Sequence, residues 1–168
     1  MCIFVSFYDR EHWQPLQLNL PVSSIHDLVV KDDELVVATH GRSFWVLDNL
    51  TPLRQANSQS ANTDFTLYQP QTALLLNYPT DVDKRQPVGE NPPSGAMIDY
   101  YFKSAPKDEV TLDILDRQGK LVRHLSSKEK KENEQPHEWP DRGETTKTIP
   151  AAEGINGYPW DLRDDDPG

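Results

Sequence analysis

The chain has 168 residues and a formal net charge of −10, because 17 Lys and Arg stand against 27 Asp and Glu. Nucleic acids and anionic membranes bind clustered basic side chains, so this charge disfavours both as partners. The apolar runs are far shorter than the ~20 residues that cross a bilayer as a helix, and the single cysteine, Cys2, excludes an internal disulfide and a cysteine-based zinc cluster.

Short strands dominate the prediction for residues 1–54. They are recognised by β-branched and aromatic side chains and by alternation of apolar and polar positions. The predicted strands are residues 2–7, 13–18, 25–30, 35–40 and 43–48. The strand at 35–40 is apolar at consecutive positions, which predicts a meander whose middle strand is covered by neighbouring sheets on both faces.

A change of composition separates this region from the rest of the chain. A short helical turn with Pro52 at its first position is predicted at residues 51–55. Residues 55–64 are rich in Asn, Ser and Gln and are interpreted as a linker between two domains.

Residues 65–163 form a second strand-rich unit, which is followed by an acidic tail at 164–168. The predicted strands are residues 65–68, 73–76, 95–102, 110–115, 120–125 and 157–163. Strands at this spacing, separated by long polar loops, favour a small β-sandwich. The fold class is therefore predicted to be all-β.

The segment from Ser6 to Trp13 resembles an Asp box, the Ser-x-Asp-x-Gly-x-Thr-Trp signature of BNR-repeat propellers. In an Asp box the Asp accepts backbone N–H groups in a tight turn, and the Trp packs underneath as an apolar anchor. Here Asp9 lies one place later than in the signature, and Arg10 and His12 occupy its Gly and Thr positions.

Two further segments extend the resemblance in chain order. Residues 38–48, Ala-Thr-His-Gly-Arg-Ser-Phe-Trp-Val-Leu-Asp, look like the closing blade of bacterial sortilin-like, BNR-repeat glycosyl-hydrolase-type proteins. Residues 154–163 resemble the Gly-x-Asn-x-x-x-Trp-Asp-Leu-Arg strand of the immunoglobulin-like (flagellar-hook-cap-like) sandwich that commonly follows such a propeller. The resemblance implies that residues 1–54 are the last blade and part of the preceding one.

The same resemblance implies a non-catalytic structural or interaction segment, linked to binding of carbohydrate or protein. Its partners would include the missing upstream blades of a longer secreted protein. An extracellular or periplasmic location follows from the resemblance alone, because the residues after Met1 lack the basic region of a signal peptide. Two alternatives stay open: one axial carboxylate of a glycoside hydrolase, or a free-standing β-sandwich adaptor for protein partners.

Five residues are candidates for a functional site. Asp27 and Asp48 are the carboxylates within otherwise apolar strands, and either could serve glycoside hydrolysis or accept backbone N–H groups at a strand end. His40, Arg42 and Trp45 could present a cation and an aromatic plate to a sugar. The alternative is a hydrogen-bonded His in a turn and a Trp that packs in the core.

The histidines do not predict a metal centre. His12, His26 and His40 are spaced 14 residues apart each way, which matches no helix face and no short metal-binding motif. No metal and no cofactor is expected.

Overall fold

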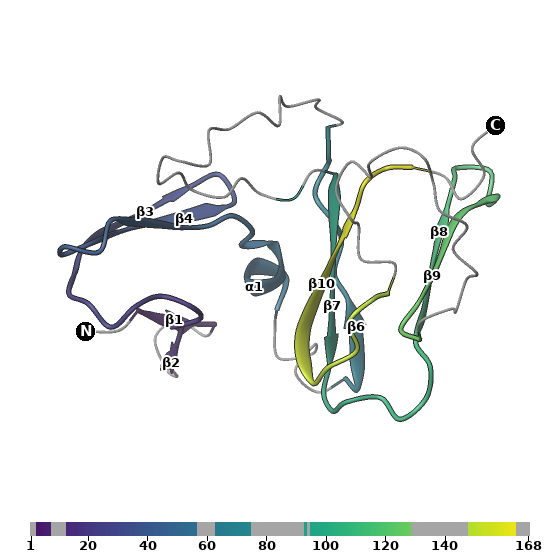
Figure 1. Ribbon diagram of the computed structural model, residues 1–168, viewed down its shortest axis with the longest axis horizontal. Coiled ribbons are helices and arrows are strands. Elements are labelled where there is room, and N and C mark those ends of the chain that lie inside the picture. Colours follow the sequence, from purple (N-terminus) through teal and green to yellow (C-terminus); the bar gives the residue numbers. More distant parts are fainter. Residues whose placement is uncertain are drawn as a thin grey trace, which may run out of the picture. The chain divides into compact units, whose positions relative to one another are not determined.

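The computed structural model describes residues 3–7, 13–56, 63–74, 93, 95–128 and 148–163. Over these residues the protein is all-β, with ten strands in several small antiparallel sheets and one short helix (Figure 1). The chain divides into two compact units, Met1–Asn62 and Thr63–Gly168. The division falls inside the segment that composition predicts as a linker.

The first unit contains a hairpin, a three-stranded meander and a helix. Its elements are β1 (Phe4–Ser6), β2 (Trp13–Pro15), β3 (Ile25–Lys31), β4 (Glu34–Thr39), β5 (Phe44–Leu47) and α1 (Thr51–Gln55). β1 pairs with β2, and β3, β4 and β5 form one antiparallel sheet in that order. The predicted meander and helical turn are confirmed. The strand predicted at 13–18 is too long, because the chain turns at Leu18, whose φ is 43°, and Leu20 N–H bonds to the Gln17 carbonyl.

Among the residues that the structure describes, the meander is covered on one face. Leu35 and Val37 of β4 are buried and pack with apolar residues that flank the β1–β2 hairpin, such as Ile3 and Leu16, and with Leu53 of α1. On the opposite face Val29 and Val46 are 57% and 49% exposed. The described residues supply one of the two covering layers predicted for the middle strand, and the second layer stays a prediction.

The second unit combines a three-stranded sheet with a hairpin. Its strands are β6 (Phe65–Leu67), β7 (Ala96–Phe102), β8 (Thr111–Leu115), β9 (Leu121–Ser126) and β10 (Gly154–Trp160). The sheet has the order β10-β7-β6, and β8 pairs with β9. Two predictions need correction: Ala73 and Leu74 lie outside any strand, and β10 runs from Gly154 to Trp160 instead of over 157–163, because it pairs with the whole length of β7. Residues 75 and 76 lie outside the described part.

Polar side chains hold the turns of this unit. Asp116 Oδ1 accepts the backbone N–H groups of Gln118 and Lys120, which closes the predicted turn between β8 and β9. Asn156 is 5% exposed, and its side-chain amide bonds to the backbone of Ala152 and Gly154. Asn156, the Asn of the Gly-x-Asn segment, thus stabilises the turn that leads into β10.

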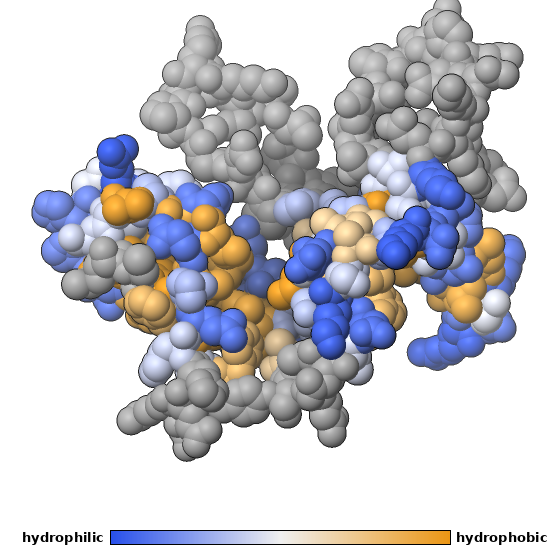
Figure 2. Space-filling model, turned by 90° about the horizontal axis from the view of Figure 1, so that it is seen from below, coloured by the Kyte–Doolittle hydropathy of each residue, from blue (hydrophilic) through white to orange (hydrophobic). Residues whose placement is uncertain are grey.

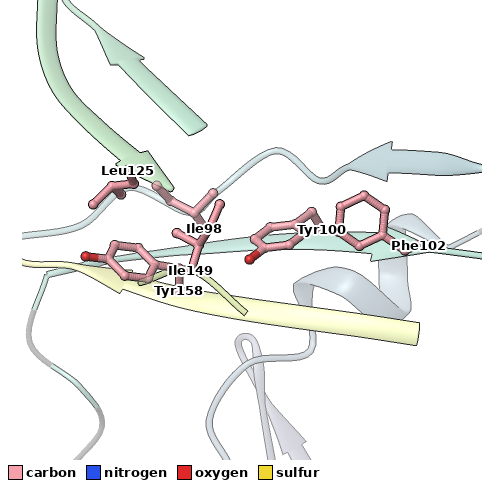
Figure 3. Packing of buried hydrophobic residues seen from close by; sticks show 6 residues of the cluster. All are labelled: Ile98, Tyr100, Phe102, Leu125, Ile149 and Tyr158. Atoms are coloured by element: carbon pink, nitrogen blue, oxygen red, sulfur yellow. The ribbon is translucent and has the colours of Figure 1, made fainter. Parts of the chain in front are cut away.

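The hairpin and the sheet of the second unit share one apolar core. The buried residues are Ile98, Tyr100, Phe102, Leu125, Ile149 and Tyr158. Figure 3 shows Tyr100 and Phe102 side by side on β7, with Leu125 reaching in from β9. Tyr100 and Phe102 meet edge to face, with ring centroids 5.6 Å apart, a geometry that stabilises aromatic pairs beyond the area they bury.

Tyr100 makes the stability of this core depend on pH. Burial raises the pKa of its phenol from 10.0 to about 12, and its hydroxyl donates a hydrogen bond of 2.5 Å to the Pro150 carbonyl. The folded state therefore keeps a proton that the unfolded state releases above pH 10. This contribution to stability is present below pH 10 and is lost as the pH rises through about 12.

Replacing Tyr100 with Phe should reduce the stability that the protein loses at alkaline pH. We expect Tyr100→Phe to cost about 1 kcal/mol near neutral pH, where the hydrogen bond is lost. Its free energy of unfolding should then fall less than that of the parent between about pH 9 and about pH 11. Urea unfolding at both pH values measures the difference, and equal losses in the two proteins would contradict it.

Candidate functional site

The open edge of β3 carries the first candidate carboxylate. Asp27 follows a bulge, where the register between β3 and β4 shifts after Ile25. Its side chain is exposed, and Oδ1 accepts the N–H of Leu28 at 2.9 Å. Among the described residues β3 pairs only with β4. The Asp27 carboxylate therefore accepts an N–H group at a strand edge without a described partner, a position where charged side chains commonly limit association.

The two candidate carboxylates lie apart. Asp27 is level with Ala38 and Phe44 across the sheet, and Asp48 follows the end of β5 four residues after Phe44. Four residues of strand span roughly 13 Å, and two strand spacings separate the edges by a further ~9.6 Å. The carboxyl pair of a glycosidase is about 5–9.5 Å apart, so these two do not form one.

Trp45 and Arg42 are joined through the backbone. The indole N–H of Trp45 donates to the Arg42 carbonyl at 2.8 Å. Trp45 is half-buried and packs against the cluster of Leu35 and Val37. The ring therefore contributes to the core of the first unit, whereas the Arg42 side chain lies exposed.

His40 meets a second histidine at the open end of the β3–β4 hairpin. Nε2 of His26 lies 2.9 Å from Nδ1 of His40, and the ring centroids are 5.0 Å apart. One facing nitrogen donates its N–H to the other. The His40 backbone also bonds to Ser23 and Ser24. Sequence spacing missed this pair, because strand pairing brings together residues that are 14 positions apart.

The segment that resembles an Asp box begins in β1 and ends in β2, two strands that pair with each other. Ser6 of β1 lies opposite Trp13 of β2, whereas Asp9 and His12 lie outside the described residues. Trp13 is 58% exposed. This differs from the buried anchor that the signature implies, because Trp13 lines a groove instead of packing in the core. Ser6 Oγ is buried and has no hydrogen-bond partner within the described part of the chain.

That groove separates the β1–β2 hairpin from the edge of β3. It has a volume of about 760 Å³ and is lined by Ile3, Phe4, Trp13, Ile25, His26, Asp27 and Leu28. Phe4 and Trp13 are each more than half exposed. Figure 2 shows hydrophobic side chains gathered over the first unit in the view from below.

The apolar residues of β3 itself were not among the candidates. Leu28, Val29 and Val30 are 49%, 57% and 54% exposed. Their sequence is a short apolar run, which is typical of a strand buried on both faces. Only the pairing pattern reveals that this run forms the edge of a sheet.

In comparisons with known proteins, no family model, no curated protein and no solved structure matches this chain. Within the described ranges, no group of three or more His, Cys, Asp or Glu side chains is arranged to hold a metal ion. A search of the same residues finds no helix with the length and apolar character needed to cross a membrane.

Proposed function

We propose that this chain is a non-catalytic protein-interaction segment that binds its partner along the unpaired edge of β3. The observation that carries the proposal is the exposure of Leu28, Val29 and Val30, each about half exposed on a strand that has one free edge within the described part of the chain. An extended partner segment would add a strand there, gaining backbone hydrogen bonds and apolar contacts together.

The energetics of the first unit support this function. Its buried cluster within the described residues consists of Leu35, Val37 and Leu50. Fully burying a Val or Leu side chain contributes about 1.5–3 kcal/mol, and a strand added beside β3 would gain a part of this for each of its three half-exposed side chains. A partner strand is one way to gain this free energy, and the groove beside Trp13 leaves room for its side chains.

The resemblance supports a place for this segment in a larger architecture. We propose that the meander is part of the last blade of a BNR-repeat, sortilin-like propeller and that the second unit is an immunoglobulin-like module. The order of the matching segments and the antiparallel meander support this assignment. An extracellular or periplasmic location belongs to the same proposal, as does binding of carbohydrate or protein by the parent protein. The glycoside hydrolase alternative has no comparable support, since the Asp27 carboxylate is bonded to Leu28 N–H.

Site-specific photo-crosslinking tests the interaction function. A benzophenone amino acid replaces Val29 on the β3 edge, and a control protein carries it at Thr111, an exposed position of β8 in the second unit. After illumination in the producing cell, we expect one discrete protein adduct from Val29 and none of the same mass from Thr111. Identical adduct patterns, or none from Val29, would contradict an interaction along β3.

A further inference from the structure

We propose that the partner of the β3 edge is a second copy of this chain, joined by antiparallel pairing of β3 with β3. This inference rests on the proposed function, because it names the partner of the same surface. It is carried by two independent features of the strand: the direction of its backbone groups and the placement of its charges.

The backbone pattern identifies which groups are available. Lys31 and Glu34 flank the two-residue turn between β3 and β4, and such flanking residues form a hydrogen-bonded pair. Hydrogen-bonded and non-hydrogen-bonded pairs alternate along an antiparallel ladder. Leu28 and Val30 therefore direct their N–H and C=O groups toward the open edge. The bond from Leu28 N–H to the Asp27 side chain agrees with this direction.

One symmetric register uses all of these groups. When Val29 lies on the two-fold axis, Leu28 of one copy faces Val30 of the other, and each such pair exchanges two backbone hydrogen bonds. The same register places Asp27 of each copy directly opposite Lys31 of the other copy, so the dimer contains two such pairs. Both residues then stand in non-hydrogen-bonded pairs, where the side chains lie closest. Opposite charges in such pairs favour this register.

The interactions of Lys31 and Asp27 that dimerisation would replace are weak. Lys31 Nζ lies 3.1 Å from Asp32, and both side chains are at least three-quarters exposed. Exposed ion pairs of this kind contribute little. Asp27 accepts Leu28 N–H in the isolated chain. In the dimer that N–H donates to the second copy, and the Asp27 carboxylate moves to Lys31 of the second copy. Asp27 thus covers the edge in the single chain and selects the register in the pair.

Pairing joins the two meanders into one six-stranded sheet. Leu28 and Val30 of each copy then face one side of the sheet, and the two Val29 side chains meet on the other. The contact is self-complementary, as a two-fold interface requires. It also removes the free edge of β3, a position at which unprotected strands associate without specificity.

A charge-swap series tests the register. We compare the parent with Lys31→Asp, with Asp27→Lys/Lys31→Asp, and with Lys120→Asp, which makes the same charge change in the exposed turn of the second unit. Sedimentation equilibrium at about 0.15 M salt, where charges further apart than ~8 Å are largely screened, gives the dissociation constant of the dimer from the 19.2 kDa chain. Circular dichroism checks that each variant is folded.

We expect the parent to dimerise and Lys31→Asp to weaken the dimer at least tenfold. The double variant should recover most of this loss, because each Lys at position 27 faces an Asp of the second copy. Lys120→Asp should change the dissociation constant less than threefold. A dimer that Lys31→Asp leaves unchanged, equal weakening by Lys31→Asp and Lys120→Asp, or no recovery in the double variant would overturn the proposed pairing.

A backbone variant gives a test that does not depend on charge. Val30→Pro removes an outward N–H but no bond of the β3–β4 ladder, a substitution that edge strands tolerate. We expect it to abolish dimerisation of the folded chain. A monomeric parent that yields a Val29 adduct with a different protein would overturn self-pairing and leave the interaction function standing. A monomeric parent with no adduct would overturn both.

Discussion

Leu125→Ala is expected to cost the second unit about 2–5 kcal/mol of folding free energy, the range for removing a large apolar side chain from a packed core. Leu125 is 2% exposed and projects from β9 into the cluster that contains Tyr100 and Tyr158 of the three-stranded sheet. It is therefore one of the contacts that hold the β8–β9 hairpin to that sheet. Since whole domains are stable by only about 5–15 kcal/mol, much of the stability of this unit depends on it.

Leu121 supplies a matched control on the same strand. It is 50% exposed, so Leu121→Ala removes the same atoms from a position that is partly in water. We expect a cost below about 1 kcal/mol, because little cavity forms at such a site. Hydrogen exchange of the β7 amides in increasing urea reports the second unit by itself. Equal destabilisation by the two substitutions would show that the core does not depend on Leu125.

Gly95→Ala is expected to destabilise the second unit by about 2–5 kcal/mol. Gly95 precedes β7 with a φ of 106°, a conformation that L side chains rarely adopt. A Cβ at this position would lie 2.0 Å from the carbonyl oxygen of Trp160, at the end of β10. The cost combines about 1–2 kcal/mol of backbone strain with about 1–3 kcal/mol for a clash that only movement of the backbone relieves.

Gly119→Ala separates these two contributions. Gly119 has a φ of 81° in the turn between β8 and β9, and nothing lies within 4 Å of a Cβ added there. The strain is then present without the clash, so we expect a cost of only about 1–2 kcal/mol. Urea unfolding monitored by circular dichroism measures both variants. A Gly95→Ala effect no larger than that of Gly119→Ala would show that the ends of β7 and β10 separate easily.

The two units differ in how completely they bury their apolar residues. In its described part, the second has a cluster of six buried residues drawn from three strands and the segment before β10. The first buries Leu35, Val37 and Leu50, while one face of its sheet stays exposed among the described residues. An interaction function is therefore better placed on the first unit, where association gains apolar contacts that folding has left unmade.

Local patterns of alternating or consecutive apolar side chains predicted β3, β4 and β8 well. β8 keeps the alternation of exposed and half-buried residues that its sequence shows, and the turn after it ends at Gly119 with a positive φ. β3 and β4 lie within one residue of their predicted bounds. The start of β10 was misplaced by three residues. Its N-terminal part pairs with β7 despite two glycines, and pairing with a distant strand leaves no local signal.

At the candidate site, too, local sequence predicted some features and only strand pairing revealed the others. The apolar context of Asp27 makes it a candidate, but its role at a strand edge follows from the fact that β4 is the only partner of β3 among the described residues. His26 and His40 gave no motif, although the ladder brings their ring nitrogens to 2.9 Å. Trp45 contacts the core, as the alternative to a sugar-binding role predicted. Trp13, in contrast, lies exposed in a groove.

By itself, the sequence determined the class of the protein: all-β, strongly acidic, and divided near a polar segment rich in Asn and Ser. These properties follow from charge, from side-chain alternation and from turn residues, all of which act over a few positions along the chain. Only the tertiary structure decided that the apolar run of β3 forms an open edge among the described residues, and that one face of its sheet is covered. Which strand lies at an edge depends on which distant segments pair, and that is a balance of long-range contacts that no short stretch of sequence contains.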